Sequence, residues 1–314
     1  LSIAVVSKVI VDTVRGGGRR LGGGGAQAAV GALIASHDGV KNCALFAPVG
    51  ADFDARLLEG LRARGVDASG VRTLADVPTT PGEAIRYEGE TMVWEPVGWD
   101  HWEELCAWAP PPESLDGFDA IHCLVEGGGR GEVDAVLEAH ARRANRSPAQ
   151  PPLFLSVEPV MHEVDAESLH GLARITRQAD VVSPDLATAA RISGVHGQRG
   201  GGPNTGRTGP PESGGLLGEF LGTEAAASWL VEPLCGEDLP RDGGSVAAVL
   251  RGCAAALGMK PGSVLAVRDG ARGSYLLHVG NGTRGENSSL PNPASMRIGP
   301  VKVEQVLDPT GAIS

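Results

Sequence analysis

Four short stretches of the sequence carry residues that could bind a small ligand. Asp12 follows the β-branched run of residues 2–11, which favours a buried strand, and open α/β sheets place ligand-binding groups at the carboxyl ends of strands. The glycines of residues 22–25 open a helix-like segment, where they let the backbone approach a ligand closely and leave amides available at the helix start. Asp185 begins another helix pattern, and the last stretch is Asp308-Pro309-Thr310-Gly311-Ala312.

These stretches need strands and helices that bring them together. Short apolar runs alternate with amphipathic segments along most of the chain, which indicates a mostly parallel sheet with helices on both faces. Residues 79–99 instead predict a β-hairpin, with Glu88-Gly89-Glu90 at its turn. Strands are expected at residues 42–49, 119–125, 152–159, 180–184 and 263–279, and helices at 131–145, 168–179, 185–194 and 246–259.

Composition restricts the class of ligand. The formal net charge is −11 and aromatic residues make up 4% of the chain, which argues against nucleic acid, because phosphate contacts need clustered Lys and Arg and stacking needs aromatic rings. The phosphates of ATP are compatible with this charge, since backbone amides, helix N-termini and a metal ion can hold them. No run of about 18 apolar residues is present, so no membrane span is expected.

Several familiar site motifs are absent from the sequence. There is no GxxxxGK[ST] phosphate loop, no GxSxG nucleophile elbow and no HExxH zinc helix. The glycines of residues 22–25 do not make a dinucleotide fingerprint, because Gln27 stands in the last glycine position and the run lies about ten residues beyond the first strand. The five cysteines include no CxxC pair, so we expect buried, reduced thiols.

Three local features have both a structural and a functional interpretation. Asp52 precedes the helix pattern FDARLLEGLRARG and is expected to be its N-cap. Trp94, Trp99 and Trp102 are expected to belong to a packed lid or to a satellite cluster rather than to an aromatic cage. Residues 194–218 hold ten glycines in 25 positions and almost no apolar side chains, so we expect a disordered insertion there.

The order of these features resembles the PfkB or ribokinase family of carbohydrate kinases. The resemblance spans nearly the whole chain. It implies a ribokinase-like, Rossmann-type three-layer α/β fold with a mostly parallel sheet, one domain over residues 1–314, and a small β lid formed by segments of about 13–20 and 83–96. The elements that carry it are the Gly24-Gly25 helix start with Gln27 inside it, the block PVGADFDARLLEGLRARGVD at residues 48–67, Gly270-Ala271-Arg272-Gly273, and the terminal DPTGA.

The resemblance also implies an activity, the ATP-dependent transfer of a phosphoryl group to a hydroxyl of a sugar or related small molecule. The implied cofactors are ATP and Mg²⁺, with Asp185 as a metal ligand, and a monovalent cation is an optional addition. Backbone amides of an anion hole would stabilise the charge on the transferred group. The implied residues are Asp12, Gly24, Gly25 and Gln27 for the substrate, Asp185, Gly270 and Gly273 for the nucleotide, and Thr310, Gly311 and Ala312 for the anion hole.

The family pattern is interrupted in three places. Ser314 stands where the family has its catalytic aspartate, after Ile313 in place of a glycine, and a serine hydroxyl is a poor general base near neutral pH. The family's N-x-x-E reads Asp185-Leu186-Ala187-Thr188, and Thr188 has no charge to offer a metal. The helices that follow the anion hole are missing. Two hypotheses follow: a kinase that is truncated at its C-terminus, or a non-catalytic ligand-binding or regulatory protein on the same fold.

The expected partner is a sugar-like small molecule, whose identity the sequence does not reveal. The resemblance also allows a homodimer, because lids of this family sometimes pair between subunits. Neither nucleic acid nor a membrane is an expected partner. We expect a cytoplasmic location, with organellar targeting left open, because the sequence begins at Leu1 without Met and a targeting peptide would lie outside it.

Overall fold

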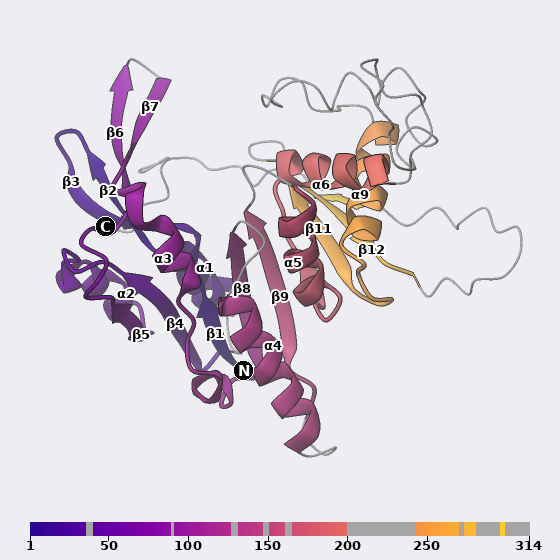
Figure 1. The fold of residues 1–314 in the computed structure, drawn as a ribbon, viewed down its shortest axis with the longest axis horizontal. Helices are drawn as coiled ribbons and strands as arrows, with labels where there is room; N and C mark the ends of the chain where they lie inside the picture. The colour runs from indigo at the N-terminus through magenta and orange to yellow at the C-terminus, as the bar shows by residue number, and fades with distance from the viewer. Residues whose placement is uncertain are drawn as a thin grey trace, which may run out of the picture. The chain divides into compact units, whose positions relative to one another are not determined.

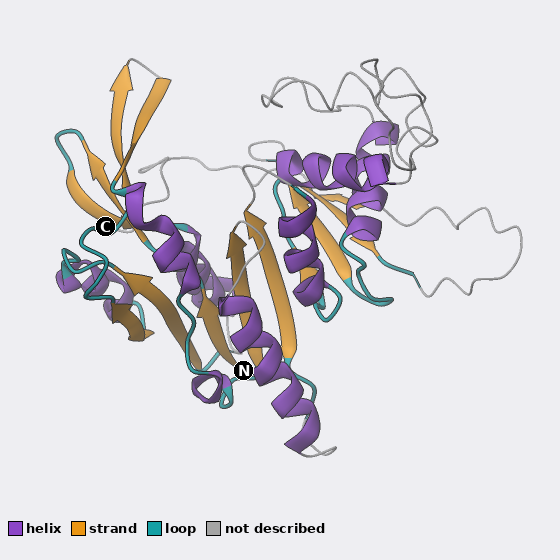
Figure 2. Cartoon of the chain, in the orientation of Figure 1, coloured by secondary structure: helices purple, strands orange, loops and turns teal. Residues whose placement is uncertain are grey.

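The structure is a computed structural model, drawn as a ribbon in Figure 1 and by secondary structure in Figure 2. It describes residues 1–35, 40–88, 91–126, 131–146, 151–160, 165–199, 243–269, 273–280 and 296–298. The chain divides into two compact units. Of the described residues, unit 1 contains 1–125 and 131–155, and unit 2 contains Glu126 and those between 156 and 298.

The main sheet of unit 1 is built from short runs of small and β-branched residues. Its strands run in the order β8–β1–β4–β5, and every pairing among these four is parallel. Ala29 of α1 packs with Val5 and Leu45 in the core beside this sheet, and all three are fully buried. The strands are β1 (Ser2–Val6), β4 (Asn42–Val49), β5 (Val66–Thr73) and β8 (Ala120–Glu126); the helices are α1 (Gly24–Ala35), α2 (Glu59–Ala63), α3 (Trp102–Ala107) and α4 (Gly131–Arg146), with 3-10 turns η1 (Ala55–Leu58), η2 (Trp99–His101) and η3 (Pro112–Leu115).

Four further strands of unit 1 form a separate small sheet in the order β3–β2–β6–β7. Strands β2 (Ile10–Val14) and β3 (Gly18–Gly22) make one antiparallel hairpin, and β6 (Gly82–Glu88) and β7 (Thr91–Val97) make the other. A short parallel pairing of β2 with β6 joins the two hairpins. This sheet is the predicted lid, and its strands extend one to three residues beyond the expected segments.

Unit 2 continues the alternation of strands and helices. Strands β9, β10 and β11 pair in parallel, and β12 and β13 extend the sheet beyond β11 in antiparallel orientation. The strands are β9 (Phe154–Val160, whose first two residues belong to unit 1), β10 (Val181–Val182), β11 (Val264–Arg268), β12 (Ser274–His278) and β13 (Met296–Ile298); the helices are α5 (Ala166–Thr176), α6 (Leu186–Arg199) and α9 (Gly243–Ala256). The observed sheets and flanking helices confirm the predicted α/β class.

Helix α6 runs further than its glycine content predicts. The disordered insertion was expected from Gly194, but α6 continues to Arg199, so that boundary is wrong. Within the predicted part of the helix, the Ser193 hydroxyl contacts the carbonyl of Val249 in α9 at 2.8 Å as well as that of Ala189 in its own helix, which holds α6 against α9. Residues 200–218 lie outside the described residues.

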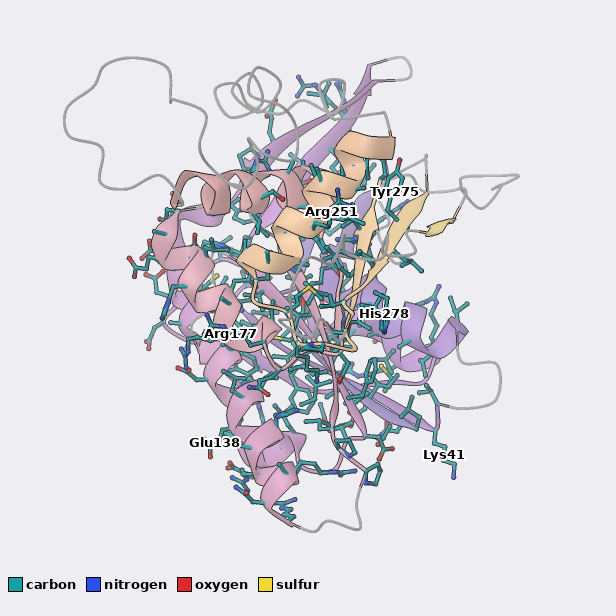
Figure 3. The ribbon with its side chains drawn as sticks, turned by 90° about the vertical axis from the view of Figure 1, so that its right-hand side faces the viewer. Lys41, Glu138, Arg177, Arg251, Tyr275 and His278 are labelled. Atoms are coloured by element: carbon teal, nitrogen blue, oxygen red, sulfur yellow. The ribbon has the colours of Figure 1, made fainter. Side chains whose placement is uncertain are left out.

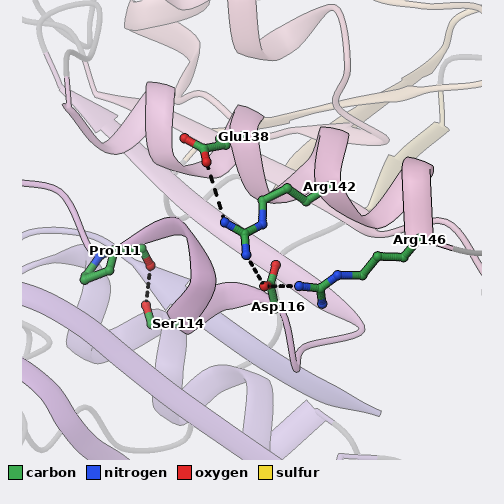
Figure 4. A network of polar contacts seen from close by, with 6 residues as sticks. All are labelled: Pro111, Ser114, Asp116, Glu138, Arg142 and Arg146. Atoms are coloured by element: carbon green, nitrogen blue, oxygen red, sulfur yellow. Dashed lines mark hydrogen bonds and ion pairs between the residues drawn. The ribbon is translucent and has the colours of Figure 1, made fainter.

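The C-terminal half of α4 is tied to the connection that precedes β8. Arg142 donates to a carboxylate oxygen of Asp116 at 2.8 Å, and Arg146 contacts the same oxygen (Figure 4). Glu138 lies 3.6 Å from Arg142 on the same helix. Because α4 is one continuous helix, this anchor also restrains its first turn. Among the described helices of both units, none is long and apolar enough to cross a membrane.

The cysteines differ in expected reactivity. Cys43, Cys123 and Cys253 are buried, whereas Cys106 is partly exposed. Burial raises the pKa of Cys43 to about 11 and also raises the pKa of Cys123 and Cys253. Because the thiolate is the reactive form, brief alkylation of the native protein at pH 7 should modify Cys106 and leave the buried thiols intact until the protein is denatured. Peptide mass mapping measures this, and rapid native modification of the buried thiols would contradict it.

Candidate functional site

Asp12 lies in the lid, in a position that differs from the sequence prediction. Residues 2–11 do not form one strand, since β1 ends at Val6 and β2 begins at Ile10. The pairing of β1 with β4 ends where the amide of Ser7 donates to the carbonyl of Phe46 at 3.0 Å, and the chain then leaves the main sheet. Asp12 is therefore inside a lid strand and not in the loop beyond a single long first strand.

The Asp12 carboxylate is buried at the base of the lid, where the residue is 4% exposed. Its Oδ1 accepts the amide hydrogen of Glu83 at 3.3 Å, which links β2 to β6. The carboxyl group lies over Gly22, where an added Cβ would come within 2.9 Å of the Asp12 Cγ. A carboxylate offers about four acceptor positions, so it can hold a lid amide and ligand hydroxyls at once.

Asp52 anchors the lid and does not cap a helix. Its Oδ1 accepts the amide hydrogen of Thr80 at 2.7 Å, and its Oδ2 lies 3.9 Å from the guanidinium of Arg19 in β3. The N-cap of η1 is Asp54, whose side chain accepts from the amide of Arg56. The expected N-cap role of Asp52 is therefore wrong, because a partner 28 positions away outcompetes the local helix.

Thr80, which no sequence pattern indicates, completes the base of the lid together with Trp99 of the tryptophan cluster. The hydroxyl of Thr80 accepts from the amide of Gly50 at 2.9 Å, and the indole of Trp99 donates to the carbonyl of Gly82 at 3.0 Å. The rings of Trp99 and Trp102 lie 4.6 Å apart, as the predicted tryptophan cluster requires, and the Trp94 side chain lies outside the described residues. The close spacing of the tryptophans was the only sequence signal for this contact.

In unit 2, Asp185 follows β10 and holds the start of α6. Its Oδ1 accepts the amide hydrogen of Thr188 at 2.7 Å, and its Oδ2 accepts the Thr188 hydroxyl at 2.9 Å. Thr188 is 1% exposed, so this helix cap is largely shielded from water. Both carboxylate oxygens of Asp185 thus serve the helix start in the structure.

The end of β11 carries two more polar contacts. The guanidinium of Arg268 lies 2.6 Å from the carboxylate of Glu158 in β9. Asp269 accepts from the hydroxyl of Tyr275 at 3.3 Å, and Figure 3 labels Tyr275 on β12. The turn between β11 and β12 ends at Gly273, whose φ of 100° is rare for other residues and whose carbonyl accepts from the Asp269 amide. In the described part of the chain, no group of three or more His, Cys, Asp or Glu could hold a metal ion.

No family model matches the chain, and no curated protein matches it. Solved structures do. A fructokinase from Halothermothrix orenii is 15% identical with a TM-score of 0.54, covering 95% of this chain and 85% of that one. A ribokinase from Cryptococcus neoformans in complex with ADP is 13% identical with a TM-score of 0.52, and the match covers 98% of this chain and 82% of the ribokinase. An Escherichia coli protein assigned as ribokinase II, in complex with ATP and Mg²⁺, is 16% identical with a TM-score of 0.53, and the match covers 97% of this chain and 80% of that protein.

The fold is that of the ribokinase-like carbohydrate kinases. In this ribokinase-like chain, the glycines at the start of α1 have protein atoms as their neighbours. A Cβ on Gly24 would overlap the side chain of Leu124, and a Cβ on Gly25 would come within 2.5 Å of the Ser7 Cβ. They permit close contact of α1 with the ends of β1 and β8, while Gln27 is exposed on α1. A substrate role for Gly24, Gly25 and Gln27 stays a prediction.

The remaining residues assigned by the ribokinase-like pattern divide between the two units and the undescribed segments. Asp12 lies in the lid of unit 1, and Asp185 and Gly273 lie near the strand ends of unit 2. The predicted nucleotide residue Gly270, the anion-hole residues Thr310, Gly311 and Ala312, and Ser314 at the catalytic position lie outside the described residues.

Proposed function

We propose that this chain binds a sugar or similar polyol through Asp12 and a nucleotide near Asp185 and Gly273, and that it transfers a phosphoryl group from ATP to a hydroxyl of the polyol. The observation that carries the proposal is the buried Asp12 carboxylate at the base of the lid. Hydrogen bonds between hydroxyls and a carboxylate are charge-assisted and gain strength where water is excluded. A second reason is the ribokinase-like fold, whose solved members include a fructokinase and a ribokinase.

The proposal for the nucleotide has its own support. The ADP and ATP complexes belong to proteins of the same fold. In this chain, the start of α6 supplies backbone amides of the kind that hold phosphates. Mg²⁺ usually keeps several waters and takes one or two protein carboxylates together with nucleotide phosphates. Each Asp185 oxygen accepts one hydrogen bond from Thr188 and keeps a further acceptor position, so Asp185 could also be such a carboxylate. The metal would neutralise phosphate charge there.

One observation favours a second candidate function, ligand binding without phosphoryl transfer. Thr188 occupies the position where the ribokinase family has a glutamate, and it is buried with its amide and hydroxyl both bonded to Asp185. This arrangement is a stable helix cap and brings no second negative charge to a metal. A protein with this cap retains the fold and the polyol site and lacks part of the metal site.

A panel experiment separates the two functions. The purified protein is incubated with Mg²⁺, ATP and each of a set of sugars, sugar alcohols and nucleosides, and products are followed by mass spectrometry. A new phosphorylated product establishes the kinase. Thermal stabilisation by a polyol without product supports the binding function, because a ligand at 100 times its Kd stabilises the native state by about 2.7 kcal/mol. If no member of the panel gives a product or stabilises the protein, both the kinase function and the binding function are refuted.

A further inference from the structure

Unit 1 contains an ion pair with almost no exposure to water. Lys8 Nζ lies 3.3 Å from Glu132 Oε1, and the two side chains are 3% and 1% exposed. In every other ion pair that joins two described residues, one side chain is at least 36% exposed. The Lys8–Glu132 pair is thus a feature of the core, and neither the sequence patterns nor the fold likeness accounts for it.

A buried ion pair contributes little net stability. Both charges lose their hydration, and well-packed apolar residues of similar volume are often as stabilising or more so. Removal of only one partner destabilises the folded protein far more than removal of both, because it leaves a buried charge without compensation. In some proteins, what such a pair adds is a preference for one particular arrangement of the elements that carry it.

Lys8 belongs to the segment that leads from the main sheet into the lid. Residues 7–9 connect β1 to β2, and Asp12 follows four positions after Lys8. On the α1 side this segment packs closely against glycines, since a Cβ added to Gly25 would lie 3.1 Å from the Lys8 carbonyl oxygen and one added to Gly23 would lie 3.2 Å from it. The Lys8 side chain reaches Glu132 in the first turn of α4. The segment is therefore fixed to two helices at once.

We infer that Lys8 and Glu132 are positioning residues for Asp12: their charge pair fixes the path of residues 7–9 and so the placement of the Asp12 carboxylate. The expected effect on polyol binding rests on the proposed function. Its structural consequence concerns only the lid, because a displaced Asp12 would lose the hydrogen bond from the Glu83 amide at 3.3 Å. Misplacement of a binding group by a remote change costs up to about a hundredfold in activity.

The test is the double variant Lys8→Met/Glu132→Leu, which removes both charges and keeps the volume of the core. We expect stability to urea close to that of the wild type. We expect the affinity for the polyol found with the panel to fall by between about tenfold and a hundredfold, the affinity for ADP to stay unchanged, and hydrogen exchange of the Glu83 amide to accelerate. In an Asp12→Asn background the same double change should reduce polyol affinity no further, because coupled residues are not additive.

A matched control makes the same two chemical changes at exposed positions. Lys41→Met/Glu138→Leu alters one lysine near β4 and one glutamate of α4, both labelled in Figure 3, and should leave polyol affinity and Glu83 exchange as in the wild type. Lys8→Met/Glu132→Gln, which also leaves neither charge uncompensated and keeps the shape of the Glu132 side chain, serves if the first double variant does not fold, and should shift both readouts in the same direction. Wild-type polyol affinity and wild-type Glu83 exchange in a folded charge-free variant would overturn the inference. If the wild type binds no polyol, the proposed function fails, and Glu83 exchange alone decides the inference.

Discussion

Replacement of Gly82 by alanine should destabilise the protein by about 3 kcal/mol, at the upper end of the usual range for overpacking. An alanine Cβ would overlap the carbonyl oxygen of Val11 and come within 2.6 Å of its carbonyl carbon. These are backbone atoms of the neighbouring lid strand, so no side-chain rotation relieves the clash. The strands must separate, which strains the bonds from the Val11 amide to Pro81 and from Trp99 to the Gly82 carbonyl.

Urea unfolding measures this loss, and the matched control is Gly31→Ala. A Cβ on Gly31 would meet nothing within 4 Å, and Gly31 lies inside α1. Alanine at such a helical position stabilises by roughly 0.5–1 kcal/mol. Equal stability of the Gly82→Ala variant and the wild type would mean that β2 and β6 do not approach each other as described. A loss of stability in the Gly31→Ala variant would mean that the surroundings of Gly31 in α1 are not as described.

The fold was predictable from the sequence because its signals are local. Apolar runs of strand length alternate with amphipathic segments, and most of the elements they predict are observed, with shifted ends. The first strand is an element whose end local sequence patterns do not predict. Residues 2–11 are mostly apolar and β-branched, and the polar pair Ser7-Lys8 that interrupts them does not by itself mark the exit from the sheet, since strands also carry polar residues. That exit depends on α1 and α4, which contact the segment from distant parts of the chain.

The candidate site was predictable in part, for the same reason. The sequence places Asp12 after one long first strand, whereas it lies inside the lid strand β2, and its partner Glu83 lies 71 positions away. Its role toward a substrate stays a prediction. Asp52 and Asp54 are two residues apart and both suit an N-cap, so only the tertiary contact with Thr80 decides between them. The Lys8–Glu132 pair has no local signature at all. Residue types thus indicate candidate residues, but contacts between distant parts of the chain determine the role of each.

Replacement of Asp12 by asparagine should weaken polyol binding strongly while leaving the lid in place. Asparagine keeps a carbonyl oxygen that can accept from the Glu83 amide, so its variant should retain the β2–β6 contact. It removes the negative charge, and a lost charged hydrogen bond costs about 1.5–3 kcal/mol, or roughly ten- to 150-fold in Kd. Asp12→Ala removes the acceptor as well, so it should lose the same affinity and also speed hydrogen exchange at Glu83.

Titration calorimetry with the polyol found in the panel measures the effect, and Asp76→Asn, at an exposed position of the same unit, is the control for a change of net charge. The comparison of the two Asp12 variants separates binding from support of the lid. If asparagine and alanine weaken binding equally and only alanine alters exchange at Glu83, the carboxylate contacts the ligand directly. If asparagine binds the polyol as tightly as the wild type, the ligand site does not include Asp12, and the buried carboxylate serves only to join β2 to β6.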